Sequence, residues 1–319
     1  MDKKTRVFNT LDRKPADRPP FTFWQHMTKE AELGQPCIAA HEKLYRDTNI
    51  DLVKMMIDGY RDVSGGLKIQ TSSEWRRVVF PKPDSPFIDG QLERINRFIE
   101  AIGDEAPVFY HSFTPFSSMR ITWGNDVVFA HLLDDEARPD FLYALGELTK
   151  RFEEFTGIFL TRTRACGMMF TLTGTEQNGV SDAQHAEFIA PSDKALIGAA
   201  NKLSPYNMLH MCGFGNRPNR LHLWRDYTAA AATVDVYEDT ITLAEAPSLF
   251  PHIRAFMGGF DITPQSLIVN GTEEEIKAHA AACVKEAGAA GYIVGAANTA
   301  PRDLSHEHIR WVGEALAGL

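Results

Sequence analysis

The chain has 319 residues, of which 44% are hydrophobic and 24% are charged, a composition typical of a globular protein. Its formal net charge of -9 weighs against nucleic acid as a partner, because neutralising phosphates requires a basic face. No apolar run approaches the roughly 20 residues of a membrane span, and no apolar segment typical of a secretory signal follows the charged start of the chain, so we expect a cytoplasmic protein without membrane association.

Short apolar runs alternate with stretches of helical periodicity along the whole chain. We predict strands at 21–24, 51–57, 107–111, 168–172, 207–211, 233–237, 254–260 and 291–295. Between them we predict helices, for example over 140–160, 191–203 and 272–287, the last with Thr272 as N-cap and Gly288 as its stop. Strands that alternate with helices pair in parallel through crossovers, and eight such units close into a barrel.

We therefore predict a single-domain (β/α)8 TIM barrel over residues 1–319, with residues 1–19 as an N-terminal extension. A doubly wound open sheet is the alternative, and the strand count favours the barrel. The oligomeric state is left open, with a homodimer as a candidate.

Catalytic residues of this fold lie where the strands end and the following loops begin. Polar side chains at the predicted strand ends are therefore the candidates for a site that takes a small-molecule substrate. We assign catalytic roles to His26, Lys54, Asp58 and Asp261, and substrate binding to Gln25, His111, Thr171, Asp235 and Asn298.

Each of these residues also has a purely structural interpretation. Lys54 meets a substrate carboxylate if its ammonium points inward, or extends to solvent. Asp261 acts as a base or caps the turn at Thr263-Pro264, and Asp235 binds a ligand or only neighbouring backbone groups. His26 and His111 are acid–base candidates or satisfied hydrogen-bonding residues.

The stretch His210-Met211-Cys212-Gly213 is the most informative in the chain. Side chains two positions apart in a strand point to the same face, so His210 and Cys212 are predicted to face the barrel mouth together. Imidazole and thiolate are preferred zinc ligands, and a catalytic zinc usually has three protein ligands. We therefore predict His210 and Cys212 as metal ligands, with an inert buried pair as the alternative.

We expect no nucleotide cofactor. The stretch Gly213-Phe214-Gly215 is followed by Asn216-Arg217-Pro218, which breaks the dinucleotide-binding pattern. A proline at that point also obstructs the helix that the pattern requires.

The sequence resembles the uroporphyrinogen decarboxylase superfamily along essentially its whole length, in segments that keep their order. These segments are Arg6-Val7, Leu11, Arg13-Lys14-Pro15, Asp17-Arg18 and Pro20 at the start, HMCG at 210–213, VDVYEDTITLAEA at 234–246, MGGFD at 257–261, and GTEEEI and GYIVGAANTAPRD within 271–303. The resemblance implies a (β/α)8 barrel, in agreement with the strand count.

The resemblance also implies one of two chemistries. One branch contains zinc methyltransferases that move a methyl group between a corrinoid protein and a thiol or another acceptor, and the other contains cofactor-free porphyrinogen decarboxylases. The methyltransferase motif pairs His210 and Cys212 with a distal cysteine, which by similarity falls at Asn298. An amide oxygen is a poor zinc ligand, so either Asp235 or Asp261 completes the site or zinc is weak or absent.

The decarboxylase branch carries arginines after the first strand for the eight carboxylates of its substrate. Here residues 24–30 contain no arginine, and Lys54 with Asp58 differs from that branch's aspartate after strand two. We therefore favour a methyltransferase, with zinc as a candidate cofactor and a methylcorrinoid protein as a candidate co-substrate. A metal-free decarboxylase, with Asp58 or Asp261 stabilising a cationic intermediate, and a non-catalytic accessory barrel are the alternatives.

Overall fold

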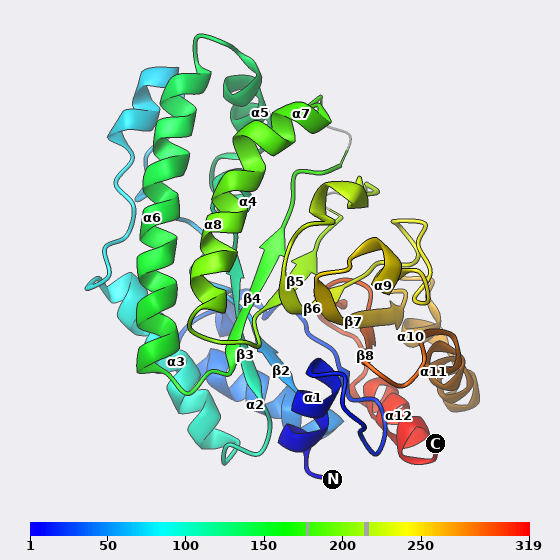
Figure 1. Cartoon of the computed structure of the whole chain (residues 1–319). Helices are drawn as coiled ribbons and strands as arrows, with labels where there is room; N and C mark the ends of the chain where they lie inside the picture. The colour runs from blue at the N-terminus through cyan, green and yellow to red at the C-terminus, as the bar shows by residue number, and fades with distance from the viewer. Residues whose placement is uncertain (177–178, 214–216) are drawn as a thin grey trace.

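Eight parallel strands form a nearly closed barrel in the computed structural model, with helices around the outside (Figure 1). The structure describes residues 1–176, 179–213 and 217–319. The strands are β1 (Phe21–Thr22), β2 (Val53–Met55), β3 (Val108–Phe113), β4 (Gly167–Leu172), β5 (Met208–Met211), β6 (Ala229–Thr233), β7 (Ile253–Phe260) and β8 (Tyr292–Ala296). Their hydrogen-bonded order is β1-β8-β7-β6-β5-β4-β3-β2, which confirms the predicted single-domain TIM barrel.

The α-helices cover the barrel wall and build up one side of its mouth. They are α1 (Lys3–Leu11), α2 (Gly34–Thr48), α3 (Pro86–Ala101), α4 (Pro115–Trp123), α5 (Asn125–Leu133), α6 (Arg138–Arg162), α7 (Asp182–Gln184), α8 (Ala190–Asn201), α9 (Ala246–Leu249), α10 (Leu267–Asn270), α11 (Glu273–Ala287) and α12 (His306–Ala317). None of the helices in the described ranges is long and apolar enough to cross a membrane.

The predicted ends of α11 are confirmed. Thr272 and Glu275 form a reciprocal capping box at its start. Gly288 takes φ 76° at its end and donates its N–H to the Val284 carbonyl. In the glycine-rich stretch, Phe214 and Gly215 lie outside the described residues.

The predicted sixth strand, 233–237, is wrong, because β6 occupies Ala229–Thr233. A run of alanines lacks the β-branched and aromatic residues that indicate a strand, yet small side chains suit this tightly packed position. Beyond β6, Asp235 Oδ1 accepts the N–H groups of Tyr237 and Glu238, which forms a turn. Asp235 therefore lies in the loop after the strand.

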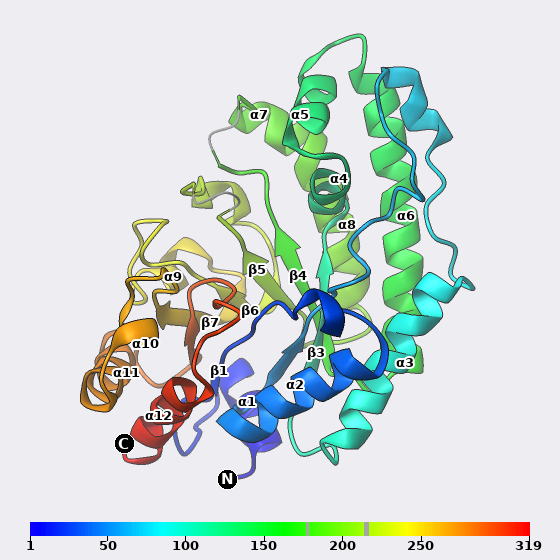
Figure 2. The ribbon, with the colours of Figure 1, turned by 180° about the vertical axis from the view of Figure 1, so that it is seen from behind.

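The N-terminal end of the barrel is closed by α1. Val7 and Leu11 of α1 pack with Phe109, Met169 and Met208, which fill the lower interior of the barrel. Figures 1 and 2 show α1 beneath the strands, on the side opposite the mouth.

The seam between β1 and β2 has no strand pairing and is joined by other hydrogen bonds. The Asp51 N–H donates to the Phe21 carbonyl, and the Asp51 carboxylate accepts the Phe21 N–H at 3.0 Å. The Thr22 hydroxyl donates to the Leu52 carbonyl at 2.8 Å. Arg6 and Arg18 both bind the buried Asp51 carboxylate.

A second hydrophobic core stands over one side of the mouth. It contains Trp75, Phe116 and Phe141, which come from the loop after β2, from α4 and from α6. Figures 1 and 2 show α4 and α5 above the C-terminal ends of β3 and β4, beside the upper half of α6. The barrel mouth is therefore walled on this side by a packed, rigid layer.

Candidate active site at the barrel mouth

A cavity of about 140 Å³ opens at the C-terminal end of the barrel. Most of its lining side chains were predicted from the strand ends. Its lining residues are His26, Lys54, Arg61, His111, Phe113, Ile121, Thr171, Thr173, His210, Cys212 and Thr299.

Strand register explains why these side chains meet. Lys54 of β2 lies opposite Phe109 of β3, and His111 follows two residues later on the same face. Thr171 of β4 lies opposite His210 of β5. These inward positions form a polar layer directly above the apolar floor of Phe109, Met169 and Met208.

His210, Cys212 and Asn298 form one hydrogen-bonded group at the barrel mouth. Asn298 Oδ1 lies 3.0 Å from His210 Nε2 and also accepts the Thr299 N–H at 2.8 Å. Because an amide oxygen only accepts, His210 Nε2 must carry the proton. Asn298 Nδ2 donates to Cys212 Sγ at 3.9 Å.

The other nitrogen of His210 is also occupied. The Thr233 hydroxyl lies 3.0 Å from His210 Nδ1 and accepts the Met211 N–H, so its own proton is directed at the ring nitrogen. Burial and the neighbouring Lys54 charge hold the pKa of His210 well below its usual range. Burial raises the pKa of Cys212 to about 11, although Asn298 and Lys54 oppose the shift. Both groups are therefore neutral near pH 7.

This donor set does not fit a catalytic zinc ion. A catalytic site needs three nitrogen, sulfur or carboxylate ligands, and His210 and Cys212 supply two. Asp235 and Asp261, which the sequence offered as a third ligand, line the neighbouring cavity, and no three His, Cys, Asp or Glu side chains come together as a metal site within the described ranges. The third position belongs to Asn298, whose amide oxygen already accepts the proton of His210.

Asp58 acts on the cavity through His26 and Arg61. The buried Asp58 carboxylate lies 2.9 Å from His26 Nδ1, accepts the Met27 N–H at 2.7 Å and pairs with Arg61. Burial opposes ionisation, but these hydrogen bonds prevail and lower the pKa of Asp58. His26 Nδ1 lies 2.9 Å from both Asp58 Oδ1 and Arg61 Nη2, so this pair fixes the orientation of the ring at the cavity rim.

Lys54 points into the barrel mouth rather than out to solvent, which were the two interpretations open from the sequence. Its side chain is only 4% exposed, and its Nζ lies 4.6 Å from the centre of the Trp24 ring. Among the described residues, Nζ has no hydrogen-bond partner. Burial lowers the pKa of Lys54 to about 7, against the raising effects of Cys212 and Asp58.

His111 has one bonded and one unbonded nitrogen. Its Nε2 lies 2.8 Å from the Thr171 hydroxyl, and its buried Nδ1 has no partner within the described part of the chain. Burial, followed by the Lys54 charge, holds the pKa of His111 well below its usual range. A neutral ring that accepts the Thr171 hydroxyl proton at Nε2 carries its own proton at Nδ1.

A second cavity, of about 370 Å³, adjoins Asn298 on the other side. Its lining residues are Asp235, Tyr237, Glu238, Asp261, Ile262, Thr263, Pro264 and Asn298. Asp261 accepts the backbone N–H and the hydroxyl of Thr263, which is the turn-capping role weighed from the sequence. Asp235 and Asp261 thus lie away from the cavity of Lys54, and their predicted roles in substrate chemistry remain predictions.

Gln25 lines neither mouth cavity in the described structure. Its Nε2 donates to the carbonyls of Pro301 and Leu304, which holds the loop between β8 and α12 against β1. Its amide nitrogen is thus used for packing rather than offered to a ligand.

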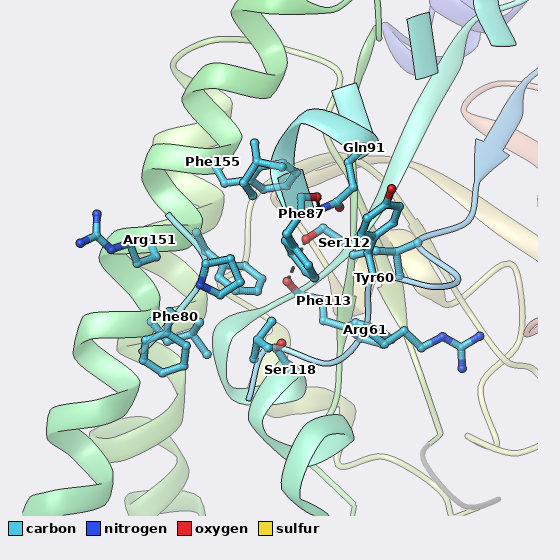
Figure 3. Close-up of a pocket in the computed structure, with 16 residues that line it drawn as sticks. Tyr60, Arg61, Phe80, Phe87, Gln91, Ser112, Phe113, Ser118, Arg151 and Phe155 are labelled. Carbon is cyan, nitrogen blue, oxygen red and sulfur yellow. Dashed lines mark hydrogen bonds between the residues drawn. The ribbon is translucent and has the colours of Figure 1, made fainter. Parts of the chain in front are cut away.

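A third, apolar cavity lies between β3, α3 and α6. Figure 3 shows Phe80, Phe87 and Phe113 gathered around it, while the guanidinium of Arg61 extends away from these rings. The cavity is about 30 Å³, room for no more than a few water-sized groups. We interpret it as a packing gap beside the site, because a substrate would not fit.

Arg61, Thr233 and Thr299 belong to the site but were not predicted. Arg61 lies in the loop three residues after Asp58, and Thr299 directly follows the predicted Asn298. Thr233 was placed at the start of a strand rather than at its end, because the sixth strand was misplaced. The spacing of Asp58 and Arg61 was the only available signal for the arginine.

The barrel topology and the polar layer at its mouth are those of TIM-barrel enzymes. The family model "Uroporphyrinogen decarboxylase (URO-D)" matches residues 68–318, and the chain belongs to this family. A comparison with curated proteins returned no match.

Solved structures share the fold at low sequence identity. A methyltransferase from Methanosarcina mazei has a TM-score of 0.72 and 13% identity, and the match covers 100% of this chain and 99% of that one. A B12-independent methionine synthase from Shewanella sp. W3-18-1, in complex with selenomethionine, has a TM-score of 0.61 and 13% identity, with 94% and 96% covered. These similarities show the fold.

Proposed function

We propose that this chain is a methyltransferase that moves a methyl group between a small substrate and a thiol, or a corrinoid carried by a partner protein. The observation that carries the proposal is the mouth cavity itself, which places a thiol and an imidazole on one wall of a space of about 140 Å³. Pockets that hold drug-sized ligands measure roughly 300–1,000 Å³, so this cavity suits a substrate smaller than a porphyrinogen. The fold similarity to a named methyltransferase supports the same direction.

The catalytic roles fall to the chain's own side chains. In transfer to a thiol, a sulfur lone pair forms the bond to the methyl carbon. The bond between that carbon and its donor breaks, and its electron pair leaves on the donor. His26, whose ring is held at Nδ1 by Asp58 and Arg61, is the group that we assign to accept the thiol proton. Asn298 Nδ2, which now faces Cys212 Sγ, is placed to donate to the reacting sulfur.

The test is a transfer assay under anaerobic conditions with methylcobalamin as the donor and 3-mercaptopropionate as the acceptor. We expect transfer that requires the protein and that falls at least about tenfold in Cys212→Ser and His210→Gln, as for other catalytic contacts. Cys283→Ser is the matched control, because Cys283 is also a free cysteine but lies on α11 away from the mouth, and it should leave the rate unchanged.

A parallel arm with uroporphyrinogen separates the methyltransferase from the metal-free decarboxylase, and we expect no decarboxylation. Turnover of uroporphyrinogen would contradict the proposal. So would stabilisation of the fold by the thiol without any methyl transfer, which is the behaviour of an accessory barrel.

A further inference from the structure

The cavity holds one buried cation that the described structure leaves without a hydrogen-bonding partner. Lys54 Nζ lies in the polar layer at the mouth, on a buried side chain, 4.6 Å from the centre of the Trp24 ring. A buried charge is normally paired, because burial removes its hydration. The nearby carboxylate, Asp58, is already occupied by His26, Arg61 and the Met27 N–H.

A second unbonded polar atom lines the same cavity, and it is a donor when the Thr171 hydroxyl donates to the other ring nitrogen. His111 lies on β3, which pairs with the strand of Lys54. It is two residues nearer the mouth than Phe109, the residue opposite Lys54. Its Nδ1 is buried and unbonded in the described structure, while Thr171 occupies Nε2. An ammonium group and a neutral N–H on neighbouring strands match the two oxygens of a carboxylate.

Other charges near the mouth limit the number of anionic groups that a ligand can carry. Beyond Asn298, the adjoining cavity is lined by Asp235, Glu238 and Asp261. Burial, with the charges of Asp235 and Asp239, raises the pKa of Glu238 to about 7. A second anionic group that extended towards these side chains would meet like charges.

We infer that the substrate is a small monocarboxylate, whose carboxylate is held by Lys54 Nζ and His111 Nδ1 while its reacting end faces His210, Cys212 and Asn298. This inference rests on the proposed function for the location of the chemistry and adds the substrate class. It develops the sequence interpretation in which an inward-pointing Lys54 meets a substrate carboxylate, and adds His111 and the single charge of the ligand. The shared chemistry of carboxylate and phosphate is anionic oxygen. Of the two cations that line the cavity, Arg61 is paired with Asp58 and Lys54 has no hydrogen-bond partner among the described residues, which favours a monoanion.

The inference is tested by binding rather than turnover. Ligand-observed NMR titrations with propionate, propionamide, succinate and inorganic phosphate measure the relative affinities at pH 7. We expect propionate to bind roughly 10- to 100-fold more tightly than propionamide, as for hydrogen bonds to a charged group. Succinate and phosphate should bind more weakly than propionate.

Lys54→Met should remove the preference for propionate over propionamide. Lys3→Met is the matched control, because the Lys3 Nζ lies 4.2 Å from the centre of the Tyr45 ring, far from the mouth, and it should keep the preference. The comparison of the acid with its amide in the wild-type protein stands even if Lys54→Met does not fold.

Equal binding of propionate and propionamide by the wild-type protein would overturn the inference, as would tighter binding of phosphate or succinate. A preference that survives in folded Lys54→Met would also overturn it. Failure of methyl transfer with the carboxylate preference intact would remove only the proposed reaction. Transfer that proceeds without any carboxylate preference would remove only the substrate class.

Discussion

The site depends on a few side chains whose hydrogen-bonding roles are fixed by their neighbours. A chain of contacts crosses the mouth from β6 to the loop after β8. It runs from Thr233 to His210, from His210 to Asn298, and from Asn298 to Cys212. In this chain Asn298 takes the place that the family resemblance assigns to a zinc-binding cysteine. Asn298 thus completes a hydrogen-bonded group at the position where the resemblance implies a third ligand.

Replacing Asn298 by cysteine should create a zinc site. The Asn298→Cys variant has one imidazole and two thiols at the mouth, which are three ligands of the preferred type. Metal analysis after incubation with zinc and gel filtration should give about one zinc per chain for the variant, and far less for the wild-type protein. The double variant Asn298→Cys/His210→Gln should lose the metal again. Equal zinc contents in the wild-type protein and in Asn298→Cys would contradict this account of Asn298.

The sequence predicted the positions of most mouth residues, because inward-facing side chains repeat every two residues in a strand. His210, Cys212, Lys54 and His111 were found in this way. Their protonation and partners could not be predicted, because these depend on contacts between residues far apart in the chain, such as that of His210 with Asn298.

At the scale of elements, strand and helix types were predicted better than their limits. The run Ala229–Thr233 was missed, since alanine carries little strand preference. The second core around Trp75 and Phe116 was also not predicted, because loop segments without periodicity give no signal of their packing. The seam between β1 and β2 depends on a buried carboxylate that no strand pattern reveals.

Replacing Asp51 should loosen this seam. In Asp51→Asn, two guanidinium groups, from Arg6 and Arg18, lose a buried negative partner. Breaking a buried ion pair costs about 3–5 kcal/mol of unfolding free energy. Urea unfolding should show this loss. Asp47→Asn is the matched control, because Asp47 pairs with Lys43 and His306 at the surface and should cost less than about 1 kcal/mol. Equal losses in the two variants would contradict the role of Asp51.

At the scale of the whole molecule, stability should depend on pH through a buried acid on α8. Asp193 is fully buried, with the Tyr227 hydroxyl 3.4 Å from its Oδ2. Burial raises the pKa of Asp193 to about 7, whereas an aspartate in the unfolded chain titrates near pH 4. Below about pH 4 Asp193 is protonated in both the folded and the unfolded chain and does not lower the free energy of unfolding. As pH rises from about 4 to about 7, only the unfolded chain releases the proton, so the free energy of unfolding falls.

Asp193→Asn replaces the ionisable carboxyl group by an amide, so the fall in the free energy of unfolding with rising pH should disappear. The variant should gain stability relative to the wild-type protein by roughly 2–3 kcal/mol between pH 5 and pH 8. Urea unfolding at the two pH values measures the change. The exposed Asp84→Asn control should show no such change. A constant difference between Asp193→Asn and the wild-type protein across this range would show that Asp193 is ionised at both pH values.

The substrate is proposed to react in the cavity between Lys54 and the wall formed by His210 and Cys212. A crystal structure of the protein with bound 3-mercaptopropionate would locate the ligand. We expect its carboxylate within hydrogen-bond distance of Lys54 Nζ and its sulfur beside Cys212 and Asn298. A ligand bound among Asp235, Glu238 and Asp261, or one outside the barrel mouth, would contradict it.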